Sequence, residues 1–178
     1  MVEEPKEKWL NYVALTTVIL AVCATLSTFK AAGYSTRSVL SQNQAANQWA
    51  YYQAKSIKSY LYEIQKDTLE LELKKDKIRG VKTFKEEYEN KIDFYAQKMK
   101  KYEGEKAEIS KEAKRLETLR DSAQRNSGIF GLALIFLQIA ILLSSISALL
   151  KKKVVWIIGM CTGAIGVVYF ANGFLLFF

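Results

Sequence analysis

Three apolar stretches limit what this chain can fold into. Residues 9–29, 128–150 and 154–178 hold 21, 23 and 25 residues without one Asp, Glu, Lys or Arg. Because about 20 apolar residues in a helix cross the hydrocarbon core of a bilayer, each stretch is predicted to be a transmembrane helix. Trp9 and Tyr12 open the first stretch as aromatic anchors at the membrane surface. The chain is therefore expected to be a membrane protein.

The first stretch also invites interpretation as a signal peptide. It is long for an apolar signal region, and the preceding tail, residues 1–8, holds three acidic residues. No small-residue cleavage site follows it clearly. We therefore favour an uncleaved span.

Between the first and second stretches, residues 36–126 are charged and show heptad periodicity, which predicts a coiled coil. In the first half the predicted seam is Leu40, Asn43, Asn47, Ala50, Ala54, Ile57, Leu61, Ile64, Thr68, Leu71, Lys75 and Ile78. In the second half it is Val81, Phe84, Tyr88, Ile92, Tyr95, Met99, Tyr102, Lys106, Ile109, Ala113, Leu116, Arg120 and Ala123.

The two seams can be folded onto one another about Gly80. Leu71 then pairs with Tyr88, and Ile64 with Tyr95, in one common register. Gly80 is a natural point of reversal because glycine takes positive φ without strain. We therefore predict an antiparallel hairpin with its turn near residue 80. The alternative is one long helix that pairs with another chain, and Gly104 is a second candidate for a kink or break.

The predicted fold is an all-α membrane protein with three transmembrane helices and this coiled-coil hairpin between the first and second. A linker is expected at residues 30–35, with a helix break at residues 31–33 and a cap from Ser35 or Thr36. A three-lysine loop, residues 151–153, is expected between the second and third spans.

Charge and composition exclude several functions. The net charge is +8, but residues 30–127 carry 21 of the 26 Lys and Arg together with 15 of the 18 Asp and Glu. This intermixed charge is typical of a solvated coiled coil rather than a nucleic-acid surface. The chain has no histidine, and Cys23 and Cys161 lie inside apolar stretches. We therefore expect no catalytic residue, metal or cofactor, and no enzymatic activity.

Residues 41–55 are rich in amides and aromatics and nearly uncharged. The candidate interaction residues here are Asn43, Asn47, Trp49, Tyr51, Tyr52 and Gln53. Asparagines in a coiled-coil seam set register and oligomeric state, and the aromatics would then pack laterally between hairpins. The other interpretation is a surface for a ligand or partner.

Small and polar residues mark the second and third stretches. Gly159, Gly163 and Gly166 share one helical face and predict close packing of transmembrane helices. Gln138 and Asn172 are intramembrane amides, which are costly without a partner. They are expected to join helices. The alternative is a conduction path that they line with Thr16 and Thr17.

Residues 42–58, Gln-Asn-Gln-Ala-Ala-Asn-Gln-Trp-Ala-Tyr-Tyr-Gln-Ala-Lys-Ser-Ile-Lys, resemble the bacterial domain-of-unknown-function family 4337. The layout is similar too, with one N-terminal span, a charged helical region and two C-terminal spans. The resemblance implies a bacterial inner-membrane protein and supplies no activity. It places Trp49, Tyr52 and Gln53 in the family's most characteristic segment.

The three-lysine loop favours the cytoplasm, because short loops follow the positive-inside rule most closely. The N-terminus would then be cytoplasmic and the hairpin external, although basic residues also flank the membrane ends of the hairpin. We expect a homo-oligomeric scaffold in the lipid bilayer whose hairpin mediates self-association or docks a protein partner. The alternatives are an oligomeric channel or transport component, or an accessory subunit of a larger complex.

Overall fold

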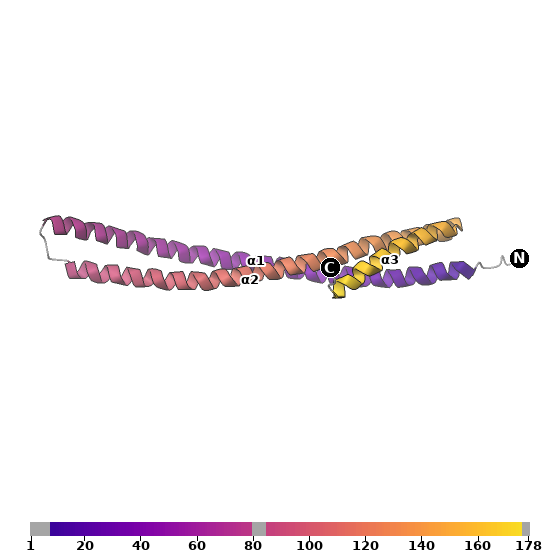
Figure 1. The fold of residues 1–178 in the computed structure, drawn as a ribbon, viewed down its shortest axis with the longest axis horizontal. Helices are drawn as coiled ribbons and strands as arrows, with labels where there is room; N and C mark the ends of the chain where they lie inside the picture. Colours follow the sequence, from indigo (N-terminus) through magenta and orange to yellow (C-terminus); the bar gives the residue numbers. More distant parts are fainter. Residues whose placement is uncertain (1–7, 80–84, 176–178) are drawn as a thin grey trace. The chain divides into compact units, whose positions relative to one another are not determined.

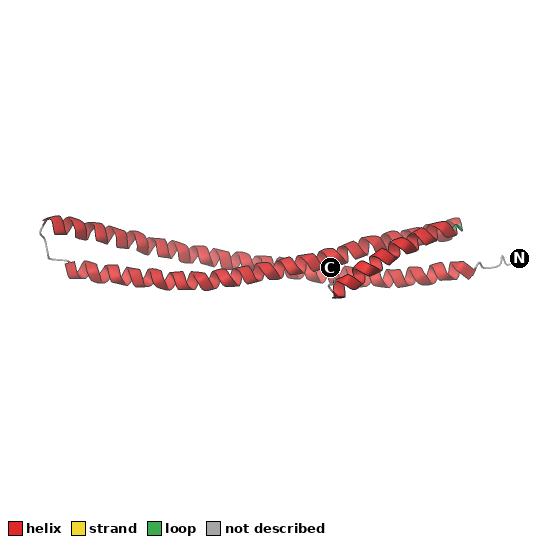
Figure 2. Ribbon diagram, in the orientation of Figure 1, coloured by secondary structure: helices red, strands yellow, loops and turns green. Residues whose placement is uncertain are grey.

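The computed structural model describes residues 8–79 and 85–175. Every described residue except Lys151 and Lys152 is helical. The helices are α1 (Lys8–Arg79), α2 (Lys85–Leu150) and α3 (Lys153–Leu175) (Figures 1 and 2). The prediction of an all-α chain with three long helices is therefore confirmed. Each helix contains a stretch that is long and apolar enough to cross a membrane, by length and composition.

The predicted linker at residues 30–35 is wrong, because α1 is helical throughout it. Thr36 does not cap a new helix. Its hydroxyl donates to the carbonyl of Ala32 at 3.0 Å, four residues back in the same helix. The physical reason is that alanines favour a helix and a single interior glycine costs only about 1 kcal/mol. One glycine between two good helical segments is too small a penalty to end the helix.

α2 is equally continuous. It passes through Gly104 and through residues 126–128, where the sequence suggested a change from hairpin to span. The three-lysine loop is nearly as predicted, except that Lys153 already belongs to α3. Lys151 has a φ of 52°, and the Lys152 amide donates to the carbonyl of Ser147 at 3.2 Å, so the connection is tight.

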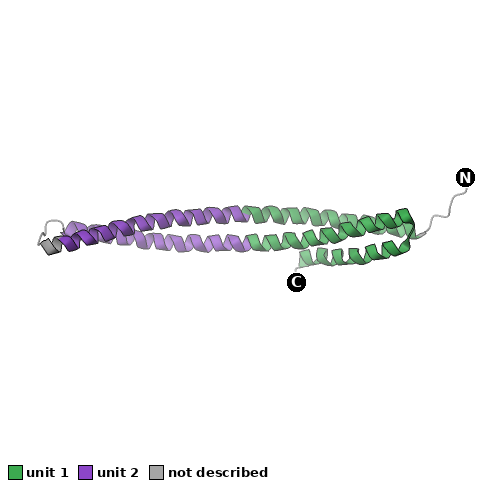
Figure 3. Ribbon diagram, turned by 90° about the horizontal axis from the view of Figure 1, so that it is seen from above, with its two compact units in different colours: residues 1–40, 120–178 green, residues 41–119 purple. Residues whose placement is uncertain are grey.

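The chain divides into two compact units, which are Met1–Leu40 with Arg120–Phe178, and Ser41–Leu119 (Figure 3). The second unit contains the hairpin arms. Its helices run antiparallel, because Trp49 bonds to Glu117 whereas Ser59, nearer the turn, bonds to Glu103. The predicted turn at Gly80, the seam positions Val81 and Phe84, and residues 1–7 of the tail lie outside the described residues.

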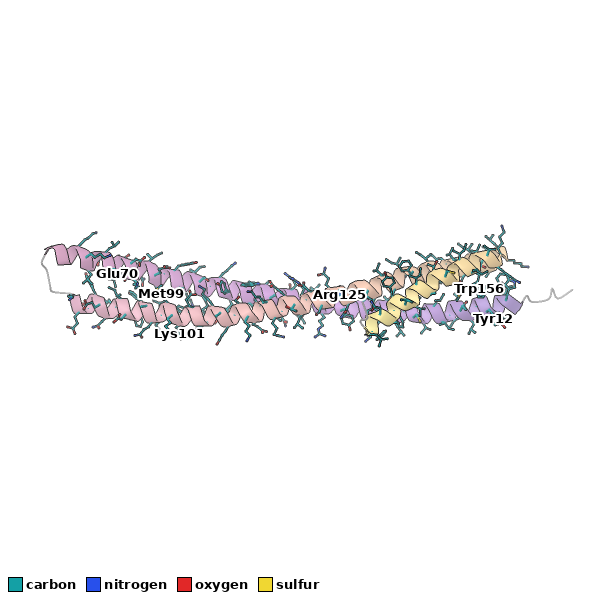
Figure 4. All side chains as sticks on the ribbon, in the orientation of Figure 1. Tyr12, Glu70, Met99, Lys101, Arg125 and Trp156 are labelled. Carbon is teal, nitrogen blue, oxygen red and sulfur yellow. The ribbon has the colours of Figure 1, made fainter. Side chains whose placement is uncertain are left out.

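The predicted seam of α2 is correct in phase. Its described positions are all buried or half-buried, namely Tyr88, Ile92, Tyr95, Met99, Tyr102, Lys106, Ile109, Ala113, Leu116, Arg120 and Ala123. Met99, for example, is half-buried, whereas Lys101 two residues later is exposed (Figure 4).

The predicted seam of α1 is wrong. All of its positions from Leu40 to Lys75 are exposed, including Asn43 and Asn47. A different heptad set in this unit faces α2, namely Ser41, Ala45, Gln48, Tyr52, Lys55, Ser59, Tyr62, Lys66, Leu69 and Leu73. Both sets have coiled-coil spacing, so periodicity alone did not choose between them.

Ring packing explains the choice of face. Tyr62 of α1 lies between two rings of α2, with centroids 5.6 Å from Tyr95 and 5.9 Å from Tyr102. Small residues such as Ala45 and Ser59 leave room beside the bulky α2 side chains. The aliphatic face of α1 offers neither the rings nor the small residues, so it is turned away from α2.

In the other unit, three helices pack at short range through small residues. A Cβ added at Gly163 would lie 3.2 Å from both Ala140 of α2 and Leu20 of α1. Leu20, Ala24, Leu137 and Ala140 form the buried core here. Phe130 is also buried, with its ring edge-on to that of Phe174 at 5.3 Å.

We predict that Gly166→Ala destabilises the packing of α3. The new Cβ would lie 2.9 Å from Cγ of Leu137 and 3.0 Å from its backbone nitrogen, which cannot move away cheaply. The expected loss is about 1–3 kcal/mol in the free energy of unfolding, measured by circular dichroism during denaturation in detergent. The matched control is Gly104→Ala, which meets no atom within 4 Å and should gain about 1 kcal/mol. A wild-type midpoint for Gly166→Ala would contradict the prediction.

Candidate interaction surfaces

Trp49 and Tyr52 are held inside the hairpin. The Trp49 indole N–H donates to Glu117 Oε1 at 2.9 Å, and its ring meets Tyr52 edge-on with centroids 5.6 Å apart. The ammonium of Lys106 lies 5.5 Å above the centroid of the Tyr52 ring. These two aromatics therefore join α1 to α2, and Glu117 is a partner that the sequence did not reveal.

The other four candidates of this segment point outward. Asn43, Asn47, Tyr51 and Gln53 are all exposed. Tyr51 is partly covered by Lys55, whose ammonium lies 5.2 Å from the ring centroid. The structure thus separates the six predicted residues into two that stabilise the hairpin and four that are available at its surface.

Two ion pairs reinforce the seam. Lys55 Nζ lies 2.6 Å from Glu105 Oε2 across the two helices, and it also lies 5.2 Å above the Tyr102 ring. Within α2, Lys106 Nζ lies 2.6 Å from Glu103 Oε1, and the Ser59 hydroxyl of α1 lies 3.5 Å from the same oxygen. Lys55 was not predicted for the seam, because its heptad phase is recognised only once the face of α1 is known.

These contacts shift the pKa values of the groups involved. The hydrogen bond from Lys55 holds the pKa of the Glu105 carboxyl below its ordinary value of 4.5. The same hydrogen bond raises the pKa of Lys55 above 10.5. The hydrogen bond to Glu103 likewise raises the pKa of Lys106. Both partners of the Lys55–Glu105 pair are therefore charged across the neutral range.

The exposed aliphatic face of α1 is the main feature that the hairpin leaves unpaired. We call Leu40, Asn43, Asn47, Ala50, Ala54, Ile57, Leu61, Ile64, Thr68 and Leu71 the outer stripe. Ile57, Leu61, Ile64 and Leu71 are 60%, 55%, 62% and 58% exposed. At 100° per residue this stripe lies about 150° around α1 from the face that meets α2.

The polar residues of the three-helix unit do not share one face. Asn172 is buried, whereas Gln138 is exposed on α2. Thr16 Oγ1 accepts a hydrogen bond from the Trp156 indole at 3.3 Å, and the Thr17 hydroxyl donates to the carbonyl of Val13 (Figure 4 labels Trp156). The expected contact of Gln138 with another helix is therefore not made within the described part of this chain. The four predicted lining residues do not converge on one path in a single copy.

Gly159, Gly163 and Gly166 are buried along α3, against Leu143, Ala140 and Leu137 of α2. Cys23 and Cys161 are free. Residues 8–79 and 85–175 contain no group of three or more His, Cys, Asp or Glu that could hold a metal ion. What this geometry offers is therefore helix surfaces for association.

Comparison with known proteins identifies one family. A family model described as a domain of unknown function (DUF4337) matches residues 9–176, which is nearly the whole chain. No curated protein and no solved structure matches it.

We predict that the hairpin loses stability in acid because of Glu105. A carboxyl whose pKa is lowered on folding contributes stability above its unfolded pKa, and that contribution is lost as pH falls through the folded pKa. The thermal midpoint should therefore drop by several degrees below pH 4.5, and by less in Glu105→Gln. The exposed Glu108 supplies the control, since Glu108→Gln should keep the wild-type acid dependence. Identical acid profiles for wild type and Glu105→Gln would contradict this assignment.

Proposed function

We propose that this chain, which belongs to the family of unknown function DUF4337, is a non-enzymatic membrane scaffold that assembles with copies of itself. Its three apolar stretches would lie in the bilayer, and its hairpin would project into water. The outer stripe of α1 would bind the same stripe of a second copy. The observation that carries the proposal is this aliphatic heptad face, which α2 leaves uncovered.

Membrane placement is supported by the side chains that the three-helix unit exposes. Large apolar residues on all three helices are more than half exposed, for example Leu15 and Val22 of α1, Leu142 of α2 and Ile157 of α3. Such a surface would be unstable in water but suits lipid tails. Asp121 is the one acidic residue described in this unit, and it lies close to Lys30, Arg37 and Arg125 only along the charged end of the sequence, outside the apolar stretches.

The outer stripe fits another helix better than it fits water. Burying the exposed half of a Leu or Ile side chain contributes about 1 kcal/mol, so four such residues offer a useful driving force. Their alternating spacing of three and four residues matches the seam of a coiled coil. A flat or irregular partner would not use that spacing.

A second copy is the occupant that we favour. Copies in one membrane project their hairpins to the same side, so two α1 helices can run parallel with identical residues side by side. Asn43 and Asn47 would then face their own counterparts, as asparagines do in coiled coils that select one register. By contrast, the exposed face of α2 carries mainly charged residues, with Phe94 as its exposed large apolar residue in the described part.

We place the chain in a bacterial inner membrane, with its N-terminus in the cytoplasm and its hairpin outside. The bacterial location follows from the family resemblance. The orientation rests on Lys151, Lys152 and Lys153, which are exposed in a connection of minimal length between α2 and α3. Short basic loops are retained in the cytoplasm more strongly than long ones.

We predict that Ile57→Gln combined with Leu61→Gln and Ile64→Gln reduces the mass of the assembly. These side chains face away from α2, so the variant should lose its partner copies while the hairpin still folds. Light scattering of the full chain in nanodiscs gives the mass, and circular dichroism gives the unfolding midpoint.

A triple control carries Glu63→Gln, Lys100→Gln and Lys111→Gln. These residues are exposed away from the outer stripe, so this variant should keep the wild-type mass. An unchanged mass for the stripe variant would refute self-association through α1. A wild-type chain that is monomeric from the start would refute the scaffold itself.

The orientation can be tested with single cysteines in a Cys23→Ala, Cys161→Ala background. Lys100→Cys, in the hairpin, should react with a membrane-impermeant maleimide on intact bacteria. Lys152→Cys should react only after the cells are permeabilised. The opposite pattern would place the hairpin in the cytoplasm.

A further inference from the structure

We infer that a second surface, on the membrane part of α2, joins two copies of this chain through Gln138. We call Gly128, Gly131, Ile135, Gln138, Leu142, Ser145 and Leu149 the amide face. The inference rests on the proposed self-association and adds to it a contact inside the bilayer. Its partner is the same face of a second copy.

The amide face has the spacing of a helix–helix seam. Its members alternate by three and four residues, so they form one line along α2. Ile135, Leu142 and Leu149 are 52%, 62% and 83% exposed. The residues of α2 that pack within the chain, such as Leu137, Ala140 and Ser144, lie about 160° around the helix. Neither α1 nor α3 therefore covers this line.

The face also allows close approach. A Cβ added at Gly128 or Gly131 would meet no atom within 4 Å, so both glycines border open space. The Ser145 hydroxyl is occupied by a bond to the carbonyl of Ile141 at 2.9 Å, which leaves a small side chain on the surface. Small residues let two transmembrane helices approach and gain van der Waals contact.

Gln138 supplies the polar contact. It is the eleventh residue of the 23-residue apolar stretch, so it lies near the middle, about 15 Å from either end at 1.5 Å per residue. Its side chain is too short to reach the headgroups from there. It makes no hydrogen bond to residues 8–79 or 85–175. An amide in hydrocarbon is costly unless it is paired, so this position requires a partner from outside the chain.

A second copy meets that requirement by symmetry. A primary amide donates and accepts hydrogen bonds, so two glutamines can bond to one another. Two copies with the same orientation hold Gln138 at the same depth, directly opposite across a two-fold axis. A different partner would need its own polar group at this depth, whereas the second copy has it without further assumption.

The test uses disulfide cross-linking of the full chain in native membranes, in the Cys23→Ala, Cys161→Ala background. Leu142→Cys lies one turn from Gln138 on the amide face. Oxidation should link it into dimers about fivefold more than Ile157→Cys, which is similarly exposed on α3. Adding Gln138→Leu should remove that excess, and adding Gln138→Asn should retain it because the amide is kept.

Equal cross-linking of Leu142→Cys with and without Gln138→Leu would overturn the inference, as would equal yields from Leu142→Cys and Ile157→Cys. The mass of the wild-type chain separates this failure from that of the scaffold. An oligomer whose cross-linking ignores Gln138 would remove only the amide contact. A monomer would remove both.

Discussion

Two helices packed side by side can bury only one face of each, and this limit shapes the hairpin. Here the shared face is built from rings and charges rather than from aliphatic side chains. Tyr62 lies between Tyr95 and Tyr102, and Lys55 reaches across to Glu105. The aliphatic residues of α1 are consequently left on the outside. The driving force for association is thus a direct result of how the hairpin itself is held together.

The continuity of α1 and α2 follows from the same geometry. Buried or half-buried positions recur along α1 with heptad spacing from Leu20 to Leu73, through the residues where a linker was expected. A helix that keeps one phase need not break when its surroundings change from apolar to charged. Only the chemistry of the residues changes, from Leu and Ala in one unit to Tyr, Ser and Lys in the other.

The sequence predicted the helical content, the three apolar stretches and the inner face of α2, because those signals rest on length and on a single periodic pattern. It failed for the inner face of α1, where two heptad patterns coexist. Leu61 and Ile64 look like core residues in one dimension, and only the demands of Tyr95 and Tyr102 exclude them. The partners of Trp49 and Lys55 were missed for the same reason, since contacts between side chains far apart in sequence depend on which face is chosen. The outward position of Gln138 likewise depends on packing against α3.

Each unpaired surface mixes apolar residues with amides, and this mixture has a thermodynamic consequence. Asn43 and Asn47 interrupt the aliphatic outer stripe, and Gln138 interrupts the amide face. An amide in a seam lowers the affinity that an apolar residue would give, but it penalises every register in which it lacks a partner. Wrong pairings therefore lose more than the correct one. Surfaces of this kind favour a defined assembly over the indiscriminate aggregation that an all-aliphatic stripe on the same helix would promote.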